Sequence, residues 1–231
     1  MELCLFIDFD HPGHSVPAVE LAALAALCGA TPRLSRALLH SPGTTSDPYL
    51  HDGPSPALAV QLYFDDIADL EAATAPNGHL QTLPRILPSL NGAEASQQAM
   101  LVRRFPVPDP SFRTASGRAH ATYLVAYRGV AEDMNAWLSY YIAHHPPIMA
   151  KFPSIRQIEI CSRLEWCGSL AYPRVEHMQR NKVVFDDAAA LTAALNSEVR
   201  HEMRRDFVHF PKFSGANTHF PMHTRTVTTG L

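Results

Sequence analysis

The sequence lacks the features that mark several large functional classes. No apolar run approaches the roughly 20 residues that a membrane-spanning helix needs. The 19 basic and 22 acidic residues give a net charge of −3 without a basic cluster, which argues against nucleic acid as a partner. No glycine-rich nucleotide loop, nucleophile elbow, kinase signature or HExxH zinc motif occurs. We therefore expect a protein that uses neither a cofactor nor a metal.

Cysteine is scarce as well. Cys4, Cys28, Cys161 and Cys167 have neither CxxC spacing nor a secretory context, so neither structural zinc nor a disulfide framework is predicted. Buried structural thiols are the favoured interpretation. The N-terminal residues, MELCLFIDFDH, carry acids where a signal peptide is basic, and we expect a cytoplasmic protein.

The remaining composition is typical of a globular protein. Hydrophobic residues make up 46% and charged residues 18% of the 231 positions, enough to bury a core without disulfide bonds. The 13 histidines are the one unusual feature of the composition.

An internal repeat divides the chain into two halves. Residues 62–73, LYFDDIADLEAA, align with residues 183–194, VVFDDAAALTAA, so that Phe64 falls on Phe185, 121 positions later. Both segments read as a strand that runs into a helix, with the second aspartate available to cap the first turn. An offset near half the chain length indicates duplication of a unit of roughly 110 residues.

Each half reads as β-α-β-β-α-β. The first half is predicted to have strands at 3–9, 32–40, 57–64 and 99–105, and helices at 16–28 and 66–75. The second is predicted to have strands at 122–127, 154–163, 182–185 and 218–228, and helices at 131–144 and 187–203. We assign 1–106 to a first ferredoxin-like repeat, 107–118 to a linker and 119–231 to a second repeat.

The most specific stretch is residues 137–156, WLSYYIAHHPPIMAKFPSIR. At about 100° per residue, Trp137 and Tyr141 fall on the apolar face of a helix, and His145 projects onto the same stripe. Pro146 disfavours a helical conformation at the residue before it, so the helix is expected to end or kink at the histidine pair. An imidazole at the end of an apolar face is a place where a buried acid or base can work.

This stretch resembles the EthD-like family of the dimeric α/β-barrel superfamily. Members carry an aromatic-rich helix, then histidine, a small residue, proline and an apolar pair, and a Pro-[Gly/Ser]-apolar-Arg entry to the second strand. The family histidine falls on His145, its proline on Pro147, and the strand entry on residues 152–156, with Ser154 where glycine is usual. The resemblance implies cofactor-independent isomerisation, dehydration, decarboxylation or monooxygenation.

The resemblance also implies how the halves pack. A four-stranded antiparallel sheet with helices on one face must bury its other face. In the resembled superfamily two such sheets form a barrel across a dimer, whereas here the second copy lies in the same chain. We predict an α+β fold of two tandem ferredoxin-like repeats packed sheet to sheet as an intramolecular dimeric α/β barrel, with a homodimer left open.

His145 is the leading catalytic candidate. A neutral imidazole near an apolar pocket can take or give a proton near pH 7, because desolvation lowers its pKa. The alternative is a structural histidine that bonds a backbone carbonyl at the helix end. His144 is assigned to substrate binding, against the alternative of a solvated neighbour. The first half offers only LCGA, residues 27–30, at the equivalent position, so that half is interpreted as scaffold.

A second group of histidines lies near the C-terminus. His209 and His219 are candidates for the partner acid of His145, because helix-following loops and last strands often shape the pocket mouth in this type of fold. On a strand, His219 and His223 share one face about 13 Å apart, too far to hold one metal ion. The alternative is that these histidines are exposed or on an edge strand, and Pro221 favours an edge or a bulge.

Aromatic and basic side chains are candidates for holding a substrate, which we expect to be small and aromatic. Tyr127, Trp137, Tyr140 and Tyr141 offer hydroxyl donors and stacking surface, although aromatic residues at helical spacing are also typical of a plain core. Arg156 can neutralise a carboxylate or phenolate, with solvent or a neighbouring acid as its alternative partner.

Three hypotheses follow from these residues. The first is a cofactor-independent lyase or isomerase that eliminates water, carbon dioxide or an aldehyde from an oxygenated aromatic compound by histidine acid–base catalysis. The second is a cofactor-free monooxygenase, which would consume oxygen. The third is a non-catalytic small-molecule-binding protein, in keeping with a first half that lacks polar machinery.

Overall fold

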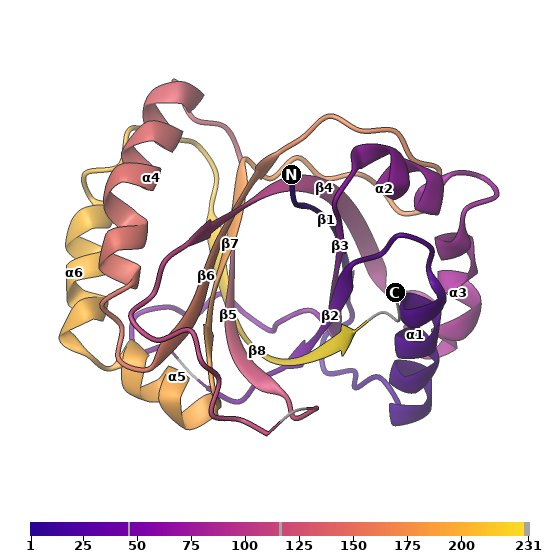
Figure 1. Cartoon of the computed structure of the whole chain (residues 1–231). Helices are drawn as coiled ribbons and strands as arrows, with labels where there is room; N and C mark the ends of the chain where they lie inside the picture. Colours follow the sequence, from indigo (N-terminus) through magenta and orange to yellow (C-terminus); the bar gives the residue numbers. More distant parts are fainter. Residues whose placement is uncertain (46, 116, 229–231) are drawn as a thin grey trace.

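The computed structural model describes residues 1–45, 47–115 and 117–228 and folds them into a closed eight-stranded barrel with helices outside it (Figure 1). Residues 46 and 116, which fall in the predicted loop and linker, lie outside the described residues. The strands are β1 (Leu3–Asp10), β2 (Arg36–Pro42), β3 (Leu58–Phe64), β4 (Glu94–Phe105), β5 (His120–Tyr127), β6 (Ile155–Arg163), β7 (Gln179–Phe185) and β8 (Asn217–Thr228). The α-helices are α1 (Ala18–Ala30), α2 (Ile67–Thr74), α3 (Leu83–Ile86), α4 (Met134–Met149), α5 (Ala188–Leu195) and α6 (Glu198–Phe207).

Each half contributes four neighbouring strands in the same spatial order. The first half pairs as β4-β1-β3-β2 and the second as β8-β5-β7-β6, all antiparallel. Antiparallel pairing of β2 with β8 and of β4 with β6 joins the two sheets. The barrel therefore closes by hydrogen bonds within one chain and leaves no sheet edge exposed.

The strand β8 pairs with β5 and with β2, so it is not an edge strand as a whole, but its register with β2 ends at Met222, next to Pro221. The carbonyl of Pro221 accepts a hydrogen bond of 2.9 Å from the Gly43 N–H, which places the proline nitrogen on the β2 side. The β2–β8 register has already ended there, at the pair of Pro42 with Met222. The missing N–H thus removes no bond from the ladder.

Helix α4 runs through the histidine pair and both prolines to Met149, so the predicted break at His144 and His145 is wrong. Pro146 and Pro147 lie in the last turn, where their lack of N–H groups costs only two helical hydrogen bonds. The Ala150 N–H donates to the Pro146 carbonyl at 2.9 Å and closes that turn. His145 is consequently held on rigid helix.

The structure divides the predicted helix at 187–203 into two helices, α5 and α6, which meet near Ser197. Asp66 and Asp187 cap α2 and α5 through hydrogen bonds to backbone N–H groups, as the repeat indicated. Ser154 has a φ of 59°, a left-handed conformation that explains why glycine is usual at this turn.

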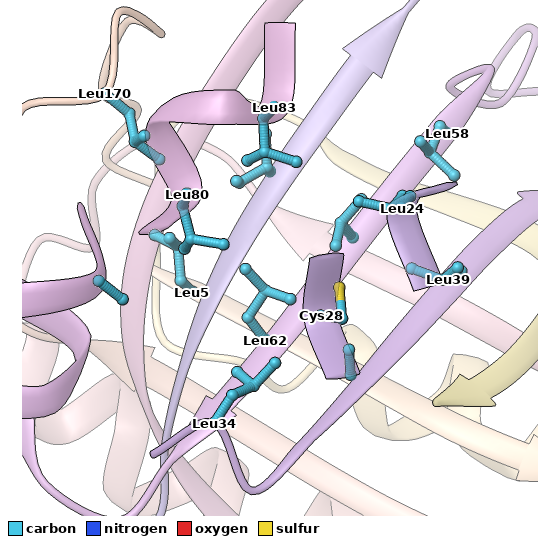
Figure 2. Packing of buried hydrophobic residues seen from close by; sticks show 14 of the residues in the cluster. Leu5, Leu24, Cys28, Leu34, Leu39, Leu58, Leu62, Leu80, Leu83 and Leu170 are labelled. Carbon is cyan, nitrogen blue, oxygen red and sulfur yellow. The ribbon is translucent and has the colours of Figure 1, made fainter. Parts of the chain in front are cut away.

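Outward-facing side chains of each sheet pack under the helices of the same half. In the first half this layer is filled by apolar residues, mostly leucines from strands and helices, among them Leu5, Leu24 and Leu62 (Figure 2). Inward-facing side chains fill the barrel and include a buried ion pair, in which Lys182 Nζ lies 2.9 Å from Glu159 Oε2. The barrel is therefore a packed core rather than an open channel.

The structure also bears on membrane-spanning helices, metal ligands and cysteines. No helix in the described part is long and apolar enough to cross a membrane. Within the same residues, no group of three metal-ligating side chains comes together. Cys4, Cys28 and Cys161 are buried free thiols, as interpreted from the sequence, while Cys167 is exposed.

Candidate active site

A cavity of about 140 Å³ lies between the outer face of the second sheet and the helices α4 and α6. Apolar and aromatic side chains form most of its wall. Polar groups reach it from five elements: Tyr123 and Tyr127 from β5, Tyr141 and His145 from α4, Asn181 from β7, Arg200 and Arg204 from α6, and Asn217 and His219 from β8. An apolar cavity with a few convergent polar groups is the usual form of a small-molecule site.

His145 forms a buried pair with Asp206 at this cavity. The Nδ1 atom of His145 lies 2.6 Å from Asp206 Oδ2, and the side chains are 6% and 8% exposed. An ionised carboxylate can only accept, so Nδ1 carries the proton and Nε2 is the ring nitrogen left for a ligand. Burial lowers the pKa of His145 despite the opposing hydrogen bond and charge of Asp206. The imidazole is therefore neutral near pH 7 and can act as a base.

Two further contacts hold this pair in place. The Tyr140 hydroxyl donates to Asp206 Oδ1 at 3.0 Å, and the Phe210 ring packs edge-on against His145 with centroids 4.9 Å apart. Burial raises the pKa of Asp206, but hydrogen bonds from His145 and Tyr140 outweigh it and leave the pKa below its usual value. Asp206 thus stays ionised and fixes the orientation of the ring.

A second imidazole–carboxylate pair lines the same cavity. His219 Nδ1 lies 2.9 Å from Asp52 Oδ2, and the His219 backbone N–H donates to the same oxygen at 2.8 Å. The hydrogen bond from His219 is the main reason that the pKa of Asp52 is lowered. His219 therefore meets His145 at one cavity, and each ring is oriented by its own carboxylate.

The loop between β2 and β3 brings first-half residues to this second-half cavity. Asp47 accepts hydrogen bonds from the Tyr123 hydroxyl at 2.6 Å and from Arg200 Nε at 3.0 Å. Leu50 of the same loop lines the cavity, and Asp52 orients His219. The interpretation of the first half as scaffold is thus incomplete, because its loop completes the site.

Amide and phenol groups form another polar part of the wall. Asn181 Nδ2 donates to the Tyr141 hydroxyl at 2.7 Å, while Asn181 Oδ1 is buried and without a hydrogen-bond partner in the described residues. Burial raises the pKa of Tyr127 and Tyr141, so both phenols remain protonated. A ligand hydroxyl placed against Asn181 would satisfy the open acceptor.

The structure separates the sequence-predicted residues into two sets. Tyr127, Tyr141, His145 and His219 line the cavity together. The other predicted residues lie outside its lining: His144, Trp137, Tyr140, Arg156 and His209.

Each residue outside the lining has another environment. His144 is exposed and its Nδ1 donates to the Tyr140 carbonyl at 2.8 Å, and His209 is exposed just beyond the end of α6. Trp137 is fully buried in the apolar layer. Arg156 pairs with Asp186 at 2.8 Å, as a structural arginine does. His209 and His144 thus lie outside the lining of this cavity, and their predicted roles in catalysis and binding stay predictions.

Sequence reasoning missed Asp206, Asp52, Asp47, Arg200 and Asn181. A signal for two of them exists, because Arg200 and Asp206 lie three residues on either side of Met203 and form with it the buried stripe of α6. The loop acids carry no such periodicity.

Comparison with known proteins places the fold. No family model matches the chain, and no characterised protein matches it in sequence. The crystal structure of an anthrone oxidase-like protein is similar over 100% of this chain and 94% of that chain, with 14% identity and a TM-score of 0.66. This likeness concerns the fold, a closed eight-stranded barrel with helices outside it.

Two further structures share this barrel fold. A "putative monooxygenase" from Lactobacillus acidophilus covers 99% of this chain and 97% of its own, with 10% identity and a TM-score of 0.53. A protein of the same description from Fusobacterium nucleatum covers 99% and 95%, with 8% identity and a TM-score of 0.56. These likenesses concern the fold, and membership of the EthD-like family stays a prediction from the motif at His145.

Proposed function

We propose that the protein is a cofactor-independent enzyme that removes a proton from a small oxygenated aromatic compound bound beside His145. The observation that carries the proposal is the buried pair of His145 and Asp206, which presents a neutral imidazole to an apolar cavity. A base within a dry cavity acts without competition from water. The reaction that we favour after proton removal is oxygenation.

Oxygenation is supported by the names of the structural neighbours. One is called "anthrone oxidase-like" and two are called "putative monooxygenase". An anthrone carries a ring CH2 group whose conjugate base is stabilised as an aromatic phenolate, so a histidine can deprotonate it. This substrate class also matches a wall of tyrosines and an open amide acceptor, Asn181.

The proposed reaction balances without an added reductant. Nε2 of His145 takes one proton from the CH2 group, and the carbanion gives one electron to O2. The resulting radical and superoxide combine at that carbon, and the His145 proton converts the peroxide anion to a hydroperoxide. Loss of the second C–H proton with hydroxide yields a carbonyl and water, so CH2 and O2 become C=O and H2O. Arg200, held by Asp47, lines the cavity and can stabilise the phenolate.

A lyase or isomerase remains the second candidate because the cavity holds two imidazoles. With His145 as base, His219 could serve as the acid that protonates a leaving oxygen. His219 replaces His209 in this role, since His209 lies away from the cavity. Product formation under strictly anaerobic conditions would favour this candidate over the oxygenase.

The test uses 1,8-dihydroxyanthrone and related hydroxyaromatic compounds with an oxygen electrode. We expect oxygen uptake by the wild type above spontaneous oxidation, and a fall of about 10²-fold or more in His145→Gln. His144→Gln is the matched control, because this neighbouring histidine is exposed and should retain activity. Equal rates for His145→Gln and wild type would refute the catalytic role. Tight binding without turnover would favour the binding-protein hypothesis.

We further propose that the chain arose by tandem duplication of a ferredoxin-like unit and belongs with the EthD-like proteins. The shared strand order of the two halves and the repeat around Phe64 and Phe185 support the duplication. The domain limits of 1–106 and 119–231 remain part of this proposal.

A further inference from the structure

A second cavity of about 130 Å³ lies at one end of the barrel interior, apart from the site beside His145. Its lining comes from the ends of β1, β4, β5, β7 and β8 and from residues beside them, such as Arg128 and His177. We call it the barrel-mouth cavity and define it by Asp10, Glu94, Arg128, His177 and Arg180. Eight-stranded barrels are just wide enough to be filled by side chains or to hold one small ligand.

Arg180 is the buried anchor of the barrel-mouth cavity. It is 3% exposed, stacks over the Phe6 ring at 3.9 Å, and donates to both oxygens of Asp8 at 2.7 and 3.1 Å. Its Nε donor is buried and has no hydrogen-bond partner in the described part of the chain. His177 Nδ1, also on the lining, is buried and unsatisfied in the same way. Buried polar atoms are usually hydrogen-bonded, so a ligand could supply an acceptor for Arg180 Nε and a partner for His177 Nδ1.

Charged side chains surround this anchor at the rim. Asp10 and Glu94 stand directly opposite each other in the β1–β4 register, which brings two like charges together, and the positive charges of Arg128 and Arg180 act on Asp10. Burial and the nearby carboxylates Asp8 and Glu94 raise the pKa of Asp10. Arg128, at the end of β5, forms no ion pair among the residues described. The rim therefore offers both an anionic and a cationic contact.

We propose that the barrel-mouth cavity binds a small zwitterion of the α-amino acid type. Its ammonium group would lie between Asp10 and Glu94, and its carboxylate would accept from Arg128 and from Arg180 Nε. Leu124 and Phe220 line the same cavity and provide an apolar wall for a short aliphatic side chain. The volume is close to that of a cavity that admits one benzene ring, about 150 Å³.

The test is isothermal titration calorimetry of the full chain with three probes that share one carbon skeleton. L-Valine carries both charges, isobutylamine only the ammonium, and isovalerate only the carboxylate. We expect valine to bind about tenfold or more tightly than either analogue, because each charge contributes its own hydrogen-bonded contact. No heat of binding for valine up to its solubility limit would overturn the proposal, as would equal affinity for isobutylamine.

Rim variants assign the binding to this cavity. Arg128→Gln should weaken valine binding about tenfold and leave isobutylamine binding unchanged, and Glu94→Gln should weaken valine but spare isovalerate. Both side chains are exposed, so neither change threatens the fold. Arg118→Gln and Glu132→Gln, at exposed positions outside the cavity lining, are the matched controls. Wild-type affinity for valine in both rim variants would refute the placement.

Discussion

The replacement Asp206→Asn tests the most specific part of the proposed chemistry. The Asp206 carboxylate can only accept, so it holds the proton of His145 on Nδ1 across 2.6 Å. An asparagine can instead donate its amide N–H to Nδ1, which moves the ring proton to Nε2 and blocks the base. In a serine-protease triad the equivalent change lowers kcat by about 10⁴-fold through the wrong tautomer. We expect a loss of about 10² to 10⁴-fold here.

The same replacement should leave the fold intact. Asp206 accepts one bond from His145 and one of 3.0 Å from Tyr140, and an amide can keep both contacts without the charge. A charged hydrogen bond contributes roughly 1 kcal/mol more than a neutral one, so the free energy of unfolding should fall by about 2 kcal/mol. Urea denaturation measures this loss, and a fall in activity far beyond it reports on the tautomer.

A direct assay of the tautomer needs no substrate. Ring ¹⁵N shifts in NMR spectra should show His145 protonated at Nδ1 in the wild type and at Nε2 in Asp206→Asn. The titration midpoint of His145 should also move lower in the variant, because the hydrogen bond and charge of Asp206 raise its pKa. Unchanged shifts and an unchanged midpoint would refute the argument.

Three further predictions concern stability and loop order. Glu159→Gln should lower the free energy of unfolding by about 3 to 5 kcal/mol in urea denaturation, because it leaves Lys182 buried without its charge partner. Adding Lys182→Met to this variant should recover much of that loss. Asp47→Asn should loosen residues 47–56, so that their amides exchange faster with deuterium while the β5 amides do not. Burial lowers the pKa of His177 to about 4, so the unfolded chain binds a proton at this residue before the folded chain does. The free energy of unfolding should therefore fall by up to about 3 kcal/mol as the pH drops from 6.5 to 4, and it should fall less steeply in His177→Gln.

The sequence predicted the parts of this fold that have a period or a repeat. The strand that ends at Phe64 and the strand that ends at Phe185 were located by their alignment, and the capping aspartates followed from it. The apolar stripe of α4 placed Tyr141 and His145 together at the cavity. The predicted end of α4 was wrong. The steric cost that Pro146 places on a helical conformation at His145 is smaller than the free energy gained by burying the last turn.

The carboxylates of the site could not be located in the same way. Asp206 is 61 residues from His145, and only the packing of α6 against α4 brings them together. Asp47 and Asp52 lie in a loop whose path depends on contacts with Tyr123 and His219 in the other half. Loop geometry of this kind is set by tertiary partners that a single sequence does not order.

The asymmetry of the two halves explains how one barrel can hold both a rigid core and a polar cavity. At the repeat offset of 121, Asn181 corresponds to Val60, which is fully buried in the leucine-rich layer of the first half (Figure 2). The first half therefore fills the space under its helices, whereas the second keeps it open and polar. Because the sheets share hydrogen bonds at both seams, the packed half can stabilise the open one.

The strand β5 shows how a single element can serve both cavities. Its odd-numbered residues, including Tyr123 and Tyr127, face the helices and line the proposed active site. Its even-numbered residues, Leu124 and Ala126, face the barrel interior and line the barrel-mouth cavity. Val125 lines both cavities, but successive side chains of a strand point to opposite faces, so substitutions at Tyr123 or Leu124 can alter one cavity without entering the other. The proposed catalytic and zwitterion-binding properties are thus separable by mutation along one strand.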